Sequence, residues 1–336
     1  MSERQRVVVT GAGAVSGFVS GGHEPLLGAL ASGAPVDPER VDRALAELVD
    51  AGEARRLSRV SQLTLAAARL AAEDAGLAPA GAVGLVIGTE LGDLRSTIQF
   101  ADGYLGRGPA GLSPLLFPNT VMNTMAAATA IALTARELSL TINALTIAGE
   151  LAIARAAAAV AAGRTPAALA GGVDELDSTV AAVLAETGGT FGPRGEAAAF
   201  LVLETLSHAT GRGARILGEI LGAASGSLPA APYGVGRTAP TYVVARALRE
   251  ASIGAGDLAR VYTGDNGDAK RDAWEARVLD AVVAGPPRVA LGLRLGQSSA
   301  LGPLKALAAT ATAPALVHGL ARGGAQAALV IGAPPA

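Results

Sequence analysis

The chain has 336 residues, of which 50% are apolar, and its 27 Lys and Arg against 29 Asp and Glu give a formal net charge of −2. Such a length and apolar content are typical of a globular chain with one large or two fused cores, and they exclude disorder. The small net charge, with no basic run interleaved with aromatic residues, excludes a nucleic-acid-binding surface. The sequence contains no cysteine, so it holds neither a disulfide framework nor a thiol.

Two features of the chain indicate a cytoplasmic protein with no membrane association. The first residues, MSERQRVVVTG, pass straight from polar residues into a strand-like run, without the apolar stretch and cleavage pattern of a secretory signal. The longest apolar stretch, residues 156–163, is rich in alanine and far shorter than the roughly 20 residues that a membrane-spanning helix needs.

The first half of the chain alternates strand-like and helical patterns. Short Val, Ile, Leu and Ala runs, typical of strands buried on both faces of a sheet, predict strands over residues 6–10, 83–88, 167–171 and 198–203. A helix that ends at Gly76 is predicted from apolar residues at three- and four-residue steps, which are Leu57, Val60, Leu63, Ala67 and Leu70. Further helices are predicted over residues 123–135 and 149–162.

The second half repeats this alternation from residue 214 onward. Strands are predicted over residues 214–223, 259–263, 289–293 and 327–331, and helices over residues 241–252 and 272–283. The last of these helices is expected to begin with a capping box, in which Asp272 is followed three residues later by Glu275. The order of elements predicts an α/β fold of two βα-rich halves, residues 1–205 and 206–336.

Residues 140–153, LTINALTIAGELAI, have the pattern of a strand that runs through a sharp turn into a helix. The segment resembles the nucleophile segment of the β-ketoacyl synthases, in which a pattern like LTVSTACASGTHAI places a reactive cysteine on the turn. Aligned without a gap, Thr146 stands at the cysteine position. A threonine hydroxyl needs a strong neighbouring base to react, whereas a cysteine is partly ionised near neutral pH. The resemblance therefore implies a ketosynthase-shaped chain without ketosynthase chemistry.

The resemblance extends over nearly the whole chain. In chain order, the similar segments are VVVTGAGAVSG, ARRLSRVSQLTLAAARLAAEDAGL, VGLVIGTELGD, LLFPNTVMNTMAA, the turn at Thr146, AALAGGVDEL, GEAAAFLVLET, ARILGEILG, LARVYTGDNGDAKRDAWEARVL and GGAQAALVI. It implies a thiolase-like α/β fold, with two pseudo-equivalent βα halves in a layered αβαβα arrangement.

The resemblance also locates the other catalytic positions of elongating ketosynthases, which use two histidines and a lysine beside the cysteine. The first histidine opens a HGTxTxxxDxxE pattern, and counting back from Asp272 and Glu275 puts Gly264 at its position. The second lies in a KSxxGH pattern, where GLRLGQ puts Gly292 at the lysine and Gln297 at the histidine. All these positions have lost the groups that would attack a thioester and stabilise an enolate.

Ketosynthase relatives without the nucleophile are known as chain-length factors, which pair with an active β-ketoacyl synthase in type II polyketide synthases. The resemblance implies a heterodimer whose partner holds the growing polyketide or polyene chain, while side chains of this subunit, inactive alone, close the acyl tunnel. The tunnel and interface residues expected from the interface-like segment LLFPNTVMNTMAA are Leu116, Phe117, Met122 and Met125. Ordinary core packing is the alternative for each, and the three-residue spacing of the two methionines favours it for them.

The resemblance implies an acyl carrier protein as a transient partner. Arg55, Arg56 and Arg59 form a basic cluster suited to its acidic surface, although a solvated helix face is the simpler explanation. Arg322 precedes Gly323 and Gly324 where the family has the gating phenylalanine of a GFGG turn. A charged gate would hinder an acyl chain from entering this subunit's own pocket.

Two other functions stay open at this point. Gly11, Gly13 and Gly17 after the first strand could form the phosphate loop of an NAD(P)-binding dehydrogenase, a weak signal because no Tyr-x-x-x-Lys pair accompanies it. A thiolase-fold acyltransferase could use Thr146 itself as nucleophile, but no histidine is expected near it. His23, His208 and His318 lie outside the family motifs and at no metal-binding spacing, so the sequence implies no metal and no cofactor.

Overall fold

The computed structural model describes residues 5–77, 82–186, 191–239 and 241–335. Their strands form one mixed sheet in the order β4-β3-β5-β6-β1-β7-β11-β10-β8-β9, and β2 pairs with β1. The first-half strands are β1 (Val7–Ser16), β2 (Ser20–Gly22), β3 (Val83–Thr89), β4 (Ser139–Asn143), β5 (Ala167–Asp174) and β6 (Ala197–Thr205). The second-half strands are β7 (Gly218–Ser227), β8 (Arg260–Tyr262), β9 (Arg288–Val289), β10 (Ala315–Leu320) and β11 (Ala325–Gly332).

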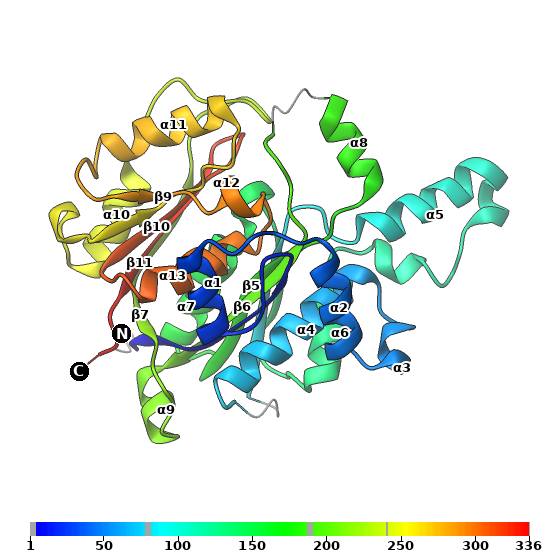
Figure 1. The fold of residues 1–336 in the computed structure, drawn as a ribbon, viewed down its shortest axis with the longest axis horizontal. Coiled ribbons are helices and arrows are strands. Elements are labelled where there is room, and N and C mark those ends of the chain that lie inside the picture. The colour runs from blue at the N-terminus through cyan, green and yellow to red at the C-terminus, as the bar shows by residue number, and fades with distance from the viewer. Residues whose placement is uncertain (1–4, 78–81, 187–190, 240, 336) are drawn as a thin grey trace.

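Helices form three layers around the two parts of this sheet (Figure 1). One outer layer holds α4 (Arg59–Asp74) and α6 (Thr124–Leu133), of which α4 packs on β1, β5 and β6. The other outer layer holds α10 (Tyr242–Ala251), on β7 and β11, and α11 (Ala269–Asp280), on β10. Between them lie α7 (Ala148–Ala161) and α13 (Leu301–Thr310), each of which contacts strands of both halves. The predicted αβαβα arrangement is confirmed.

The residues of β5 show why the sheet is covered on both faces. Successive side chains of a strand point to opposite faces. Ala168 and Ala170 belong to the core that includes α7 and α13, whereas Ala167 and Leu169 belong to the core that includes α4. Because both faces are buried, the strand is apolar throughout rather than alternating, as the sequence indicates.

The two central helices approach each other closely because their facing residues are small. A Cβ built on Gly149, in the first turn of α7, would overlap the carbonyl oxygen of Ser299 just before α13. Only glycine fits at such a backbone contact. The approach matters for function because α7 begins directly after Thr146, which is thereby placed beside the start of α13.

The remaining helical elements complete the described chain. They are α1 (His23–Ser32), α2 (Glu39–Leu48), α3 (Ala51–Ala54), α5 (Leu94–Arg107), η1 (Gly108–Gly111), η2 (Phe117–Thr120), η3 (Leu145–Ile147), α8 (Ser178–Glu186), α9 (Leu206–Gly211), η4 (Ala255–Asp257) and α12 (Gly292–Leu295). α5 and α8 project from the body of the molecule in Figure 1. β6 ends at Thr205 and α9 begins at Leu206, but the division of the chain into halves after residue 205 stays a prediction. Among the described helices, none combines the length and apolar character needed to cross a bilayer.

The structure corrects two predicted elements of the second half. The helix predicted over residues 272–283 begins earlier, at Ala269, because the carboxylate of Asp268 accepts from the N–H of Arg271 and caps it. Asp272 and Glu275 form no capping box, since Glu275 turns inward to the backbone N–H of Gly264. The strand predicted over residues 289–293 stops at Val289, and the chain turns into α12.

The glycine-rich run after the first strand is no phosphate loop. β1 continues through Gly11 and Gly13, and a Cβ on Gly11 would lie 2.6 Å from the backbone nitrogen of Ala75 just after α4. A Cβ on Gly13 would likewise meet the backbone of Ala71 within α4. These glycines allow close packing of strand and helix, which removes the basis of the dehydrogenase interpretation.

Candidate functional site

Thr146 lies at the turn between β4 and α7, as the sequence predicts for a nucleophile position. The turn is a short 3-10 helix, and its Leu145 has a positive φ of 39°, which is unusual for a leucine. The hydroxyl oxygen of Thr146 is buried and has no hydrogen-bond partner among the described residues. A hydroxyl becomes a nucleophile only when a base takes its proton. No described side chain stands in that position.

Three of the four degenerate positions meet around this hydroxyl. Gln297 donates from Nε2 to the carbonyl oxygen of Thr146 over 3.2 Å and accepts from the amide of Asn266. Gly264 donates its N–H to both carboxylate oxygens of Glu275, over 3.0 and 3.1 Å. Thr146, Gly264 and Gln297 line one narrow pocket that leaves no room for a water molecule. Gly292 lies outside that lining, with its α-carbon packed against the carbonyl of Asp265.

A buried charge cluster fills the space behind Thr146. Nζ of Lys305 on α13 is 2.5 Å from a carboxylate oxygen of Glu150 on α7 and donates to the carbonyl of His318 over 2.9 Å. Nη1 of Arg271 is 2.8 Å from Glu275, whose other oxygen lies 2.5 Å from Nδ1 of His318. All five side chains are almost completely buried. Within this cluster the acidic and basic groups are paired with one another.

The charges of this cluster stabilise one another. Burial alone would raise the pKa of Glu275, but Arg271 and His318 outweigh that effect and hold the pKa well below its ordinary value. Glu275 in turn, against the cost of burial, raises the pKa of Arg271. Both shifts favour the ionised form of each group, as expected for a buried pair.

Sequence reasoning missed this cluster. His318 was assigned no function from the sequence, yet its two ring nitrogens contact Glu275 and Gln326 inside the site. One signal was present: Lys305 is one of only two lysines in the chain and stands in the otherwise apolar run LGPLKALAAT. A lysine inside such a run is expected to have a buried acidic partner.

The expected tunnel residues fall into two groups. Phe117 is 59% exposed and Met122 is 38% exposed, whereas Met125 is 1% exposed and belongs to the core beneath α4. Leu116 is partly buried and borders a surface groove. Core packing, the alternative considered for Met125, is what the structure shows. Met122 lies over Gly92, where a Cβ would collide with its sulfur.

Exposed apolar side chains gather on the segments around α5, α6 and β4, and we call this set the apolar face. Its members are Tyr104, Leu105, Leu115, Phe117, Val121, Met122, Ile131 and Leu140. The rings of Phe100 and Phe117 lie 6.0 Å apart and hold α5 against η2. β4 pairs only with β3 among the described strands and so forms one edge of the sheet. An exposed apolar set beside an open sheet edge marks an interaction site.

The three arginines of the expected docking cluster differ in their surroundings. The guanidinium of Arg59 is held by Glu196 over 2.6 and 2.7 Å and by Asp42 over 2.7 Å, so its charge is neutralised. Arg55 and Arg56 are exposed. All three border a surface groove of about 720 Å³ that also reaches Leu115 of the apolar face. Only Arg55 and Arg56 therefore present free charge there.

One carboxyl group bordering this groove has a strongly changed acidity. Burial raises the pKa of Glu175 to about 7, and the nearby charge of Asp93 adds to the effect. Both carboxylates lie at the N-terminus of α5, where Asp93 accepts from Ser96 N–H and Glu175 from Arg95 N–H. One oxygen of each has no partner among the described residues.

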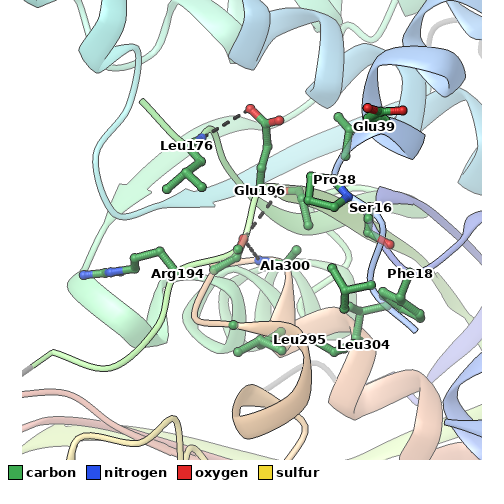
Figure 2. A pocket seen from close by; sticks show the side chains of 18 of the residues that line it. Ser16, Phe18, Pro38, Glu39, Leu176, Arg194, Glu196, Leu295, Ala300 and Leu304 are labelled. Atoms are coloured by element: carbon green, nitrogen blue, oxygen red, sulfur yellow. Dashed lines mark hydrogen bonds between the residues drawn. The ribbon is translucent and has the colours of Figure 1, made fainter. Parts of the chain in front are cut away.

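A cavity of about 310 Å³ lies apart from Thr146 (Figure 2). Figure 2 shows Phe18, Leu295 and Leu304 on one side of it and Leu176 and Glu196 on the other. Ala300 and the adjacent Ser298 form the wall nearest Gln297. Neither Thr146 nor the buried charge cluster lines this cavity.

Comparison with known proteins identifies the family. Residues 28–209, more than half of the chain, match the family model for the N-terminal domain of β-ketoacyl synthases. The chain belongs to the β-ketoacyl synthase family. It is 28% identical over 281 residues to the 3-oxoacyl-[acyl-carrier-protein] synthase 2 of Mycobacterium tuberculosis, covering 74% of this chain and 67% of that protein. A synthase of the same name from Vibrio cholerae is 28% identical over 194 residues, covering 51% of this chain and 47% of that protein.

Solved structures confirm the thiolase-like ketosynthase fold. The structure described as the ishigamide ketosynthase/chain length factor superposes with a TM-score of 0.83 at 23% identity, covering 99% of this chain and all of that one. A ketosynthase of the type II polyketide complex AntDE:AntF gives a TM-score of 0.80 at 19% identity, with coverage of 99% and 100%.

This β-ketoacyl synthase family member has no thiol for covalent catalysis anywhere in its sequence. Within the described residues, no group of three or more His, Asp or Glu side chains is arranged to hold a metal ion. The narrow pocket at Thr146 is too small for a cofactor.

Proposed function

We propose that this chain is a non-catalytic chain-length-factor subunit, which forms a heterodimer with an active β-ketoacyl synthase and shapes the acyl tunnel of a polyketide or polyene synthase. The observation that carries the proposal is the state of the Thr146 site. Its hydroxyl has no base, and Lys305, Glu150, Arg271, Glu275 and His318 fill the space behind it. A ketosynthase needs an activated nucleophile and an open oxyanion site, and the described residues around Thr146 supply no base for its hydroxyl.

The apolar face supports a partner subunit. Leu115 is 87% exposed and Phe117 59% exposed, beside the open edge of β4. Monomeric proteins seldom leave a large apolar patch uncovered. The ishigamide structure that superposes on this chain is described as a ketosynthase paired with a chain length factor, which makes an active ketosynthase the partner that we propose.

Tunnel closure is assigned to Phe117 and Met122, with Leu116 in support. Phe117 and Met122 are exposed on the apolar face and would project into the partner's surface, where they could stop a growing acyl chain. We assign Met125 to the core rather than to the tunnel end, because it is buried under α4. A close-packed tunnel end does not yield readily to an extra methylene, so a single side chain can limit length.

An acyl carrier protein is the proposed transient partner of the complex. The AntDE:AntF structure is described as a carrier protein bound to its ketosynthase. On this chain, Arg55 and Arg56 beside the groove of about 720 Å³ supply exposed positive charge for an acidic carrier surface. Arg59 contributes by fixing the groove wall through Glu196 rather than by free charge.

The test is reconstitution with the candidate partner ketosynthase. The chain is purified alone, the ketosynthase alone and the two together, and each sample receives malonyl-loaded carrier protein. We expect a 1:1 complex by size-exclusion chromatography with light scattering, and elongated acyl products by mass spectrometry from the complex only. Condensation by this chain alone would contradict the proposal. The same samples test the acyltransferase alternative, since an acyl mass shift on Thr146 would revive it.

A further inference from the structure

A second pocket, of about 250 Å³, lies on the outer side of Thr146. Segments that are far apart in the sequence border it, among them the turn at Leu145 and the loops that carry Phe191 and Tyr233. It is the space through which a substrate would have to pass to reach Thr146 from that side. Two ion pairs, Glu90–Arg194 and Asp268–Arg322, lie among the residues that line this pocket.

The first pair joins Glu90, just after β3, to Arg194, just before β6. Nη2 of Arg194 is 2.9 Å from one oxygen of Glu90, and Nη1 contacts the other oxygen. Both side chains are nearly buried. Arg194 is itself fixed, because the adjacent Pro193 and Gly195 exchange backbone hydrogen bonds with Gln297 over 2.8 and 3.0 Å. The pair thus ties the end of β3 to the segment of Pro193 and Gly195, which is hydrogen-bonded to the backbone of Gln297.

The second pair joins Asp268 at the start of α11 to Arg322 after β10. Nη2 and Nε of Arg322 lie 2.7 and 2.5 Å from the two carboxylate oxygens. The guanidinium also lies over the ring of Phe191, at 5.3 Å from its centroid, and donates to the carbonyl of Tyr233 over 3.1 Å. Arg322 therefore connects three segments that border the pocket.

The geometry of both pairs makes them lasting contacts. Arginine and carboxylate meet through two parallel hydrogen bonds in each case, which is the strongest arrangement for such groups. Each pair is largely removed from water, so loss of one partner would leave an uncompensated buried charge, whereas exposed ion pairs contribute little and exchange readily.

We infer that the Glu90–Arg194 and Asp268–Arg322 pairs close the pocket above Thr146 against an extended acyl thioester. The purpose of the closure rests on the proposed function: a carrier-bound chain that cannot enter this subunit is delivered only to the partner ketosynthase. Arg194 and Arg322 act on specificity by excluding substrate, and they take no part in bond making.

The absence of cysteine supplies a direct test. Thr146→Cys introduces the one thiol of this 336-residue chain, so its alkylation reports access to that position. Two reagents are used on the folded chain: iodoacetamide, and a chloroacetamide carried on a pantetheine arm. The rate with the pantetheine reagent divided by the rate with iodoacetamide cancels the intrinsic reactivity of the thiol and leaves the effect of reagent size. Leu293→Cys, at a site that is 57% exposed in the parent chain, gives this ratio for open access.

The pairs are then removed without leaving a lone buried charge. All three variants are made on the Thr146→Cys chain. One carries Glu90→Gln with Arg194→Met, a second carries Asp268→Asn with Arg322→Met, and a third carries all four changes. Asparagine in place of Asp268 keeps the helix cap, since it caps as well as aspartate. The matched control is Asp280→Asn with Arg288→Met, which removes a surface pair elsewhere.

We expect the ratio of the pantetheine-reagent rate to the iodoacetamide rate to be about tenfold or more lower for Thr146→Cys than for Leu293→Cys. Removal of both ion pairs should abolish most of that difference. The control pair should change nothing. Equal rate ratios for Thr146→Cys and Leu293→Cys with both pairs intact would overturn the inference. An unchanged ratio after removal of the pairs would also overturn it, provided that cooperative melting shows the variants to be folded. If the fourfold variant does not fold, the two-residue variants and the comparison of the two thiol variants still decide. Failure of heterodimer formation would leave these rates untouched, so the two proposals can fail separately.

Discussion

Gly264 lies directly against the guanidinium of Arg271. A Cβ built on Gly264 would stand 3.0 Å from Nη1 of Arg271 and 3.1 Å from a carboxylate oxygen of Glu275. Both side chains are buried and paired with each other, so neither can move away. The Arg271–Glu275 pair therefore fills the space that a side chain at position 264 would occupy.

Restoring the family's catalytic residue types should not restore activity. We expect the chain with Thr146→Cys, Gly264→His and Gln297→His to form no condensation product, because an imidazole in place of Gly264 has no room. Gly264→His alone should lower the free energy of unfolding by about 1–3 kcal/mol, as overpacking does. Mass spectrometry with malonyl-loaded carrier protein and urea unfolding measure the two effects. Turnover comparable to that of an active ketosynthase would show that the site is not blocked.

Removing one partner of the Lys305–Glu150 pair should cost more stability than replacing both partners. Lys305→Met leaves Glu150 charged and buried, and we expect it to lower the free energy of unfolding by about 3–5 kcal/mol. Lys305→Met with Glu150→Gln should recover much of that loss. Lys270, the other lysine of the chain, is exposed, and Lys270→Met should change stability by about 0.5 kcal/mol or less. Similar losses at Lys270 and Lys305 would refute this account.

Stability should fall as pH rises through the range set by Glu175. Burial keeps Glu175 protonated in the folded chain up to about pH 7, whereas the unfolded chain releases that proton near the ordinary pKa of 4.5. Between these values the folded state binds more protons, so raising the pH favours unfolding, by about 3 kcal/mol at most. Glu175→Gln should remove this component and raise stability at pH 8. Urea titrations from pH 4 to pH 8 test it, and equal slopes for variant and parent would contradict it.

The apolar face should be required for the heterodimer and not for the fold. Leu115→Asp, at a side chain that is 87% exposed, should abolish the 1:1 complex while leaving the melting temperature nearly unchanged, because a charge would be buried only in the complex. Leu293→Asp is the control, since Leu293 is exposed but lies outside the apolar face. Light scattering of the mixed subunits reports the result. A complex that survives Leu115→Asp would place the interface elsewhere.

Product length should respond to Phe117 and not to Met125. Phe117→Ala and Met122→Ala are expected to lengthen the acyl product of the complex, because each removes volume at the proposed tunnel end. Met125→Ala empties part of the core beneath α4 and should cost about 2–5 kcal/mol of stability with no change in length. Product mass and thermal unfolding separate the two classes. A length change with Met125→Ala alone would reverse the assignment.

Regular elements with strong patterns were predictable from the sequence. The apolar steps from Leu57 to Leu70 correspond to α4, and the Val- and Leu-rich runs correspond to β3 and β6, because buried strands and amphipathic helices have distinct periods. The strand predicted over residues 289–293 was wrong, because a short apolar run fits a strand and a buried helix equally well. The strand ends at Val289 and α12 follows. The cap at Asp268 was missed for a similar reason: Asp268 and Asp272 both suit a helix start, and only tertiary contacts of Glu275 decide between them.

The site was predictable in position but not in content. The turn at Thr146 follows from a local pattern, and Gln297 was correctly brought beside it by resemblance. The charge cluster joins Glu150, Arg271 and His318, residues more than 40 positions apart in the sequence, and no local pattern can pair them. Likewise, the apolar steps of Met122 and Met125 are alike in sequence, and only packing separates the exposed residue from the core residue.

The open side of β4 has a consequence for the chain before it meets a partner. β4 is hydrogen-bonded to β3 along one side, and no described strand covers its other side. Bare strand edges flanked by apolar residues recruit further strands, which leads to precipitation. We therefore expect a free copy of this subunit to self-associate more readily than the heterodimer, and matched synthesis of both subunits to limit that loss better than an excess of one.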